Sequence, residues 1–195
     1  MEGPPFFPVS SEAARRFDEV ATGRSSSWGF HVAEERVRAL PDGRGWHDAE
    51  TGLFGPRTWA VILDTESARC ARYRRTATVV IAEVVGLDDL ESVWGADIAP
   101  PEIKVIGSLL RSGVRSSDYV ARLGPRRFGI LLPETDEIAA VNFVERVRER
   151  CVAAAKQADP DAQCSFGWAD ATRIRLLSAA ADLAVGRLSM DVEPG

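Results

Sequence analysis

The sequence predicts an α/β (α+β) fold in which helices flank a mixed central β-sheet. Helical and strand patterns alternate along most of the 195 residues, of which 45% are hydrophobic. Residues 76–85, TATVVIAEVV, form a β-branched run without polar alternation, as expected for a central strand covered on both faces. A second apolar stretch enters and leaves a turn at residues 124–128, which indicates a β-hairpin. A chain of this size can bury the core of one domain.

Two proline signals predict the starts of helices before the hairpin. Pro56 follows Gly55, and Pro101 follows Pro100. Proline is favoured at the first helical position, where its missing N–H would have no partner. Residues at helical spacing follow each start, and the side chains expected to face the core are Trp59, Leu63, Ser67 and Cys70 in the first helix and Ile103, Ile106, Leu109 and Leu110 in the second.

The segment after the hairpin predicts a long helix, a short strand and a closing helix. Thr135 is expected to be the N-cap of the long helix, with Asp136 and Glu137 in its first turn, where negative charge is favourable. Residues 164–168 predict the strand and residues 173–188 the closing helix. The long helix is expected to bury Ile138, Val141, Val144, Val147, Cys151 and Ala155.

The chain is expected to divide into an N-terminal extension over residues 1–45, a domain over residues 46–189 and a tail over residues 190–195. The extension contains a proline cluster and a Gly/Ser-rich stretch, which predicts a partly irregular linker. Its aromatic side chains either pack back on the domain or form a docking segment for a partner, and both interpretations stay open.

Composition excludes several classes of protein. A net charge of -5 argues against a nucleic-acid or membrane-surface protein. No apolar run approaches the roughly 18 residues of a membrane-spanning helix, and the N-terminus lacks a signal-peptide pattern, so we expect no membrane insertion. Three widely spaced cysteines argue against a disulfide framework or a zinc site.

The most informative segment is residues 115–128, RSSDYVARLGPRRF. It resembles the signature hairpin of the GGDEF family, the bacterial diguanylate cyclases that make cyclic di-GMP from two GTP. The family's turn reads Gly-Gly-Asp-Glu-Phe and is preceded by an arginine two residues earlier. Arg122, Gly124 and Phe128 match this pattern. The resemblance implies a sheet related to those of polymerase palms and nucleotidyl cyclases. The cysteine usage and the absence of signal-peptide and membrane-spanning patterns fit a bacterial cytoplasm.

Three further segments extend the resemblance over about residues 46–189. Residues 48–53, DAETGL, resemble the family's opening D-x-L-T-G-L, with Glu50 departing from it. Residues 164–168 resemble the S-I-G strand, and residues 181–184 resemble the A-D-x-A-L helix. The order of these motifs matches the order in the family.

The resemblance also implies which residues stand at the family's active-site positions. Only Glu83 keeps a carboxylate where the family holds a metal, and Arg126 and Arg127 replace the two tip carboxylates. Phosphoryl transfer from GTP needs a divalent metal, and arginine cannot lose its charge. We therefore expect a degenerate, inactive domain without catalytic residues, metal or cofactor. The corresponding positions are Glu83, Val85, Glu91, Pro100, Gly124, Pro125, Arg126 and Arg127.

Pro125 predicts a rebuilt hairpin turn. A type I′ turn needs positive φ at both central residues, whereas proline is fixed near −65°. A type I or II turn with Pro125 in second position is expected instead. Glu83 is expected to lie near the tip and to pair with Arg126 or Arg127. An anion site on the two arginines is an alternative that stays open.

Arg115 and Asp118 form an R-x-x-D pattern five residues before the turn. This resembles the family's inhibitory site, which binds a stacked cyclic di-GMP dimer. A guanidinium can contact a guanine Hoogsteen edge or a phosphate, and a carboxylate can accept from guanine N–H groups. The resemblance also implies a second arginine, for which the sequence offers Arg72, Arg74 and Arg75 without ranking them.

Two functions therefore remain open from the sequence. In the first, an inactive domain senses cyclic di-GMP at Arg115 and Asp118 and acts through an unknown protein partner. In the second, the domain is a nucleotide-independent interaction or dimerisation module that works through the N-terminal segment or an exposed helix. A homodimer is compatible with both.

Overall fold

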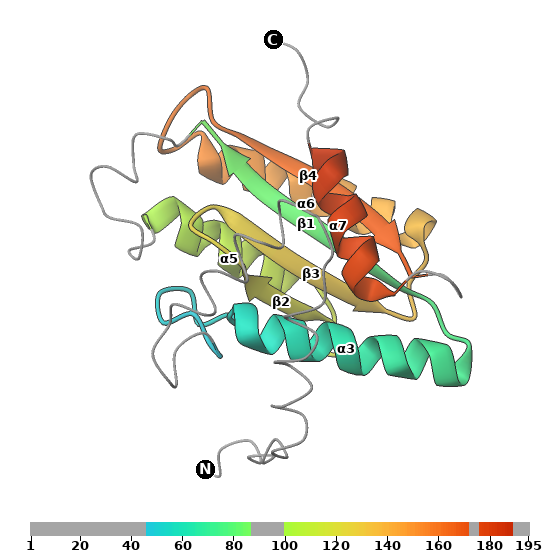
Figure 1. Ribbon diagram of the computed structural model, residues 1–195. Helices are drawn as coiled ribbons and strands as arrows, with labels where there is room; N and C mark the ends of the chain where they lie inside the picture. The colour runs from blue at the N-terminus through green and yellow to red at the C-terminus, as the bar shows by residue number, and fades with distance from the viewer. Residues whose placement is uncertain (1–45, 87–99, 172–175, 189–195) are drawn as a thin grey trace.

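The computed structural model describes residues 46–86, 100–171 and 176–188 (Figure 1). Within these residues, helices cover both faces of one β-sheet, so the predicted fold class is confirmed. The N-terminal extension, Glu91 and the C-terminal tail lie outside the described residues. The elements follow in the order α3 (Pro56–Tyr73), β1 (Ala77–Val85), α5 (Pro101–Gly113), β2 (Tyr119–Arg122), β3 (Arg127–Pro133), α6 (Glu137–Ala155), β4 (Gln163–Asp170) and α7 (Leu177–Leu188).

The sheet has the strand order β2-β3-β1-β4, and each of these neighbouring pairs is antiparallel. β1 is therefore an interior strand, as its apolar run predicts. The parallel component expected of a mixed sheet is confined, within the described residues, to an isolated bridge between Phe54 and Ala121 at the β2 edge.

Alternate residues of β1 face two different layers of helices. Val80, Ala82 and Val84 belong to the core cluster that contains side chains of α5 and α6. Val79 and Ile81 belong to the cluster that contains side chains of α3 and α7. Figure 1 shows these pairs of helices on opposite faces of the sheet. This double coverage explains why the strand has almost no polar residues, and alternation directs residue 83 toward the α3/α7 face.

The buried faces of the first two helices agree with the sequence, with one adjustment. Ser67 on α3 is only half-buried, and its hydroxyl accepts the N–H of Leu177 at 3.2 Å. Glu66 is buried beside it and pairs with Arg69 at 2.9 Å. Leu109 on α5 packs at the edge of the core. The predicted side chains that are buried are Trp59, Leu63, Cys70, Ile103, Ile106 and Leu110.

The start of α6 corrects two predictions. The N-cap is Asp136, whose carboxylate accepts the N–H of Ala139 at 2.8 Å, so the assignment of Thr135 as N-cap is wrong. Thr135 instead donates to the carbonyl of Pro133. Ile138 is 77% exposed, so its predicted burial is also wrong. It lies about 200° around the helix from the buried Ala140, because successive helical residues turn by about 100°.

Candidate functional site

Glu83 and Arg127 lie directly opposite each other in the register of β1 and β3. The Nη2 atom of Arg127 donates to both carboxylate oxygens of Glu83, at 3.0 Å each. Each side chain is 27% exposed. Next to this ion pair, the N–H of Val84 donates to the carbonyl of Arg126 at 3.0 Å. The predicted proximity of Glu83 to the hairpin tip is therefore confirmed, and its ion-pair partner is Arg127.

The hairpin turn has adapted to Pro125. Positive φ occurs, among the described residues, at Gly52, Arg74, Gly86 and Glu134, and not in the turn. A type II turn with Pro125 in second position would need positive φ at Arg126, so that alternative is excluded. The N–H of Leu123 donates to the carbonyl of Arg127 at 2.8 Å and closes the turn.

Arg122 has a structural place at the base of the hairpin. Its side chain is 4% exposed, and Nη1 lies 3.0 Å from Oδ2 of Asp48. Nε donates to the carbonyl of Gly124 and Nη2 to the carbonyl of Pro125, both at 3.1 Å. The other oxygen of Asp48 accepts both the N–H and the hydroxyl of Thr51. These bonds join the first turn of the domain to the hairpin tip.

Asp118 is directed into its own loop. It is 7% exposed, and its Oδ2 accepts the N–H of Arg115 at 2.8 Å while Oδ1 accepts the hydroxyl of Ser117 at 3.1 Å. A backbone bond from Asp118 N to Arg115 O at 3.2 Å closes the same turn. Arg115 itself is exposed. The structure thus brings Arg115 and Asp118 together, but the carboxylate is already occupied by the loop.

Arg146 of α6 also lies beside this loop. Its Nη2 donates to the carbonyl of Gly113 at 2.9 Å, two residues before Arg115, and its guanidinium lies 5.8 Å from the centroid of the Phe143 ring. Arg146 belongs to none of the motifs that the sequence shows. No local spacing signals it, because the contact depends on how α5 packs against α6.

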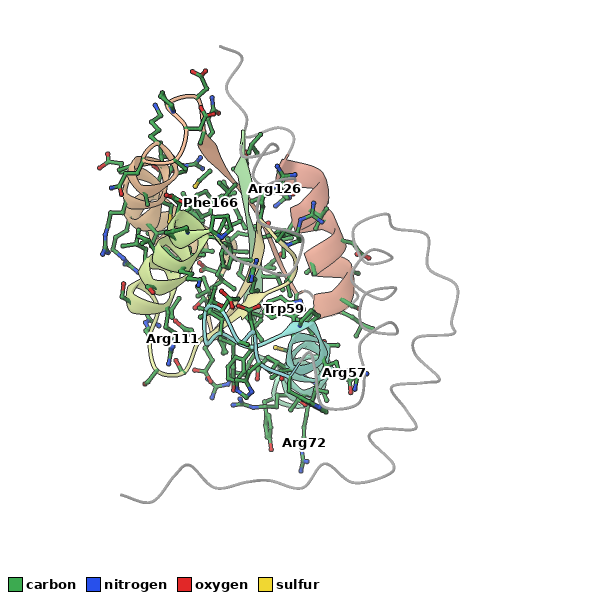
Figure 2. The ribbon with its side chains drawn as sticks, turned by 90° about the vertical axis from the view of Figure 1, so that its left-hand side faces the viewer. Arg57, Trp59, Arg72, Arg111, Arg126 and Phe166 are labelled. Atoms are coloured by element: carbon green, nitrogen blue, oxygen red, sulfur yellow. The ribbon has the colours of Figure 1, made fainter. Side chains whose placement is uncertain are left out.

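The three arginines named as candidates from the sequence lie elsewhere. Arg72 is at the end of α3, on the other helical layer, and its guanidinium lies 5.3 Å from the Tyr73 ring centroid (Figure 2). Arg74 is the C-cap of that helix, and Arg75 pairs with Glu134 at 3.3 Å. Arg146 is therefore the arginine that the described contacts bring to the loop of Arg115.

The other positions of interest are separated. Val85 is 39% exposed at the end of β1. Pro100 occupies the N-cap of α5, where its carbonyl accepts the N–H of Lys104 at 3.2 Å. Gly124 and Pro125 serve as carbonyl acceptors for Arg122. The structure does not place Glu91.

The family resemblance implies a divalent cation at the hairpin tip, but the side chains at this place do not fit one. Both carboxylate oxygens of Glu83 accept from Arg127. Across the described parts of the chain, no cluster of three or more His, Cys, Asp or Glu side chains could hold a metal ion. Divalent magnesium needs several oxygen ligands, and a fixed guanidinium charge opposes it.

The three cysteines are free and buried. Burial raises the pKa of the Cys151 thiol to about 11 and that of Cys164 to about 12. Burial also raises the pKa of Cys70, and the nearby Glu66 carboxylate adds to this increase. Protonated thiols of this kind are weak nucleophiles and poor metal ligands.

In the portion of the chain that is described, no helix is long and apolar enough to span a bilayer.

The comparison with protein families decides the identity of the domain. The family model described as "Diguanylate cyclase, GGDEF domain" matches residues 45–185. The chain belongs to the GGDEF family. The probable diguanylate cyclase DgcC of Escherichia coli K12 is 28% identical over 102 residues, which cover 52% of this chain and 28% of DgcC. Diguanylate cyclase DosC of the same strain is 30% identical over 103 residues, which cover 53% and 22%. The chain spans about a quarter of these relatives.

Solved GGDEF structures share the fold. The GGDEF domain of Caulobacter crescentus DgcB, in complex with cyclic di-GMP, has a TM-score of 0.65 at 16% identity, covering 77% of this chain and 89% of that one. Diguanylate cyclase SiaD of Pseudomonas aeruginosa, in complex with its activator SiaC, has a TM-score of 0.64 at 20% identity, covering 92% and 69%. These similarities support the GGDEF architecture and, at such identities, the fold alone.

Proposed function

We propose that this GGDEF domain is a catalytically inactive regulatory domain that binds cyclic di-GMP at the loop of Arg115 and Asp118. The observation that carries the proposal is the convergence of two arginines from different elements. Arg115 is exposed on the loop after α5, and Arg146 of α6 donates to Gly113 at the end of α5. Cyclic di-GMP offers phosphates and guanine edges, both of which guanidinium groups bind well.

In the proposed site, Asp118 stabilises the loop that carries Arg115. Its carboxylate accepts the N–H of Arg115 and the hydroxyl of Ser117, so it fixes the shape of the loop. Arg115 then projects from an ordered turn, which reduces the entropic cost of binding. The solved complex of the DgcB GGDEF domain with cyclic di-GMP supports the choice of ligand.

The second half of the proposal is the loss of catalysis. Glu83 is paired with Arg127, so its carboxylate is not open to a metal ion. Val85 and Pro100 supply no carboxylate at two further positions that the family resemblance assigns to the active site. The domain then senses the product of its enzymatic relatives without making it.

A nucleotide-independent interaction module is the second candidate. It is favoured by large apolar side chains that the described domain leaves exposed, notably Ile138 at 77% and Leu176 at 63%. Such residues are typical of protein contacts when they gather on one surface. This candidate predicts that cyclic di-GMP produces no binding signal.

Calorimetric titration with cyclic di-GMP tests the proposal. Arg115→Ala and Arg146→Ala are each expected to weaken binding by about 10- to 150-fold, the equivalent of one charge-assisted hydrogen bond. Lys156→Ala is the matched control. This exposed cation is the C-cap of the same helix, about 15 Å along it from Arg146, and its removal should leave the affinity unchanged.

Cyclic di-AMP is the control ligand, because it keeps the phosphates and lacks the guanine edge. Equal affinity of the wild type and Arg115→Ala would place the site elsewhere. The absence of binding to the wild type would overturn the proposal and favour the interaction module.

A further inference from the structure

An internal ion pair occupies the place where the family resemblance implies a metal ion. We propose that Arg127 acts as a built-in cation for Glu83, which excludes divalent cations, and that one substitution at residue 127 converts this place into a cation site. The inference shares with the proposed function only the loss of catalysis. The loop of Arg115 and the hairpin tip lie at opposite ends of β2, about 13 Å apart along the strand.

The backbone fixes the position of residue 127 independently of its side chain. β1 and β3 pair from Ala77 opposite Pro133 to Glu83 opposite Arg127. The bonds from Val84 to Arg126 and from Leu123 to Arg127 hold the turn on either side. Directly opposite residues of an antiparallel pair have Cβ atoms about 4.5–5.5 Å apart. A carboxylate at position 127 would therefore face the carboxylate of Glu83 at a distance that one cation can bridge.

The hydrogen bonding of Arg127 indicates that this side chain serves the hairpin tip mainly through its positive charge. Arg122 uses Nε, Nη1 and Nη2 for bonds to three different residues. Arg127 reaches Glu83 through Nη2, and its Nε is buried without a hydrogen-bond partner among the described residues. A side chain selected to organise a network would not leave a buried donor unpaired. Replacing Arg127 should therefore preserve the fold better than replacing Arg122.

The charges explain why the wild type excludes cations. A guanidinium stays protonated at all accessible pH values, so its repulsion of a divalent ion is permanent. Hard cations bind carboxylate oxygens, and their affinity rises with the number of ligand charges. Arg127→Glu removes one positive charge and adds one negative charge beside Glu83. The same substitution elsewhere on the surface changes the net charge equally and supplies no paired ligand.

Titration with Mn²⁺ in the absence of nucleotide tests the inference, with the free ion measured by electron paramagnetic resonance. Arg127→Glu is expected to bind at least about tenfold more tightly than the wild type. Adding Glu83→Gln to this variant should return binding to the wild-type level. Arg111→Glu is the control for net charge, because Arg111 is exposed and lies at the lower left of Figure 2, whereas Arg126 of the hairpin lies in the upper half.

Two results would overturn the inference. The first is wild-type binding of Mn²⁺ as tight as that of Arg127→Glu, and the second is a folded Arg127→Glu variant without any gain. If circular dichroism shows that Arg127→Glu does not fold, Arg127→Gln replaces it. This neutral variant should gain thermal stability from Mn²⁺ while the wild type does not, since a ligand that binds the folded state raises Tm. A Tm of Arg127→Gln that does not respond to Mn²⁺ would equally overturn the inference. Failure of any of these tests leaves cyclic di-GMP binding unaffected.

Discussion

Arg122 and Asp48 are separated by 74 positions in the sequence, and yet Nη1 of one lies 3.0 Å from Oδ2 of the other. Because Arg122 also donates hydrogen bonds to the carbonyls of Gly124 and Pro125, one guanidinium connects the turn that contains Asp48 with the hairpin tip. Asp48 lies near the start of the described residues.

Arg122→Ala is expected to lower the free energy of unfolding by about 3–5 kcal/mol, because it leaves the partly buried Asp48 carboxylate and two carbonyls without their donor. Urea denaturation followed by circular dichroism measures this change. Arg75→Ala is the matched control, since its ion pair with Glu134 is 60% and 55% exposed and should contribute less than about 1 kcal/mol. Equal losses in the two variants would contradict the structural role of Arg122.

Gly167→Ala should destabilise the domain, because α7 lies directly on β4 at this residue. A Cβ at Gly167 would lie 1.9 Å from the carbonyl oxygen of Ala184, so the helix would have to move, at a cost of about 1–3 kcal/mol or more. Gly186 lies in α7, and a Cβ added there meets nothing within 4 Å. Gly186→Ala should therefore stabilise the domain by up to about 1 kcal/mol through helix propensity. Thermal denaturation of both variants measures the difference. Similar Tm values would show that α7 can move away from Gly167 at little cost in free energy.

Incubation with GTP and Mg²⁺ or Mn²⁺ should yield no cyclic di-GMP. The reason is the pairing of Glu83 with Arg127, together with Val85 and Pro100 at positions where the family resemblance implies a carboxylate. Arg127→Glu should remain inactive even if it binds Mn²⁺, because the other positions are unchanged. Chromatography of the nucleotides, with an active diguanylate cyclase as positive control, measures the product. Product that depends on the wild-type protein would refute the expected inactivity.

The stability of the domain should decrease as the pH rises from about 9 toward 11–12. Burial raises the pKa of Cys151 from 9.0 to about 11 and that of Cys164 to about 12. The folded state holds these protons more tightly than the unfolded chain, so their contribution is complete below pH 9 and is lost above it. Each pH unit in this window costs up to about 1.4 kcal/mol per thiol. Urea denaturation from pH 8 to 10.5 should show a weaker pH dependence in a Cys151→Ala, Cys164→Ala double variant, and an unchanged dependence would contradict this assignment.

The sequence predicted the elements that local patterns define. The β-branched run predicted the interior strand β1 and the turn at residues 124–128 predicted the hairpin, whereas the proximity of Glu83 to the tip was implied by the family resemblance. Pro125 excluded a type I′ turn, because its φ is fixed by its ring. The order of the motifs indicated the GGDEF family, which the family comparison confirms.

The exposure of individual helix positions and the contacts between helices were decided by the tertiary structure. Val144, Val147, Cys151 and Ala155 of α6 are buried as expected, and Val141 is half-buried. Ile138 is 77% exposed although its residue type favours burial. Arg146 reaches Gly113 across 33 positions because α5 and α6 pack side by side. Asp118 fits the R-x-x-D pattern, but only the fold of its loop shows that its carboxylate already accepts two hydrogen bonds. The sequence by itself determined the family, the strands and the charges of the site. The packing of helices determined which charges meet, because side-chain contacts between distant elements depend on crossing geometry that no local spacing encodes.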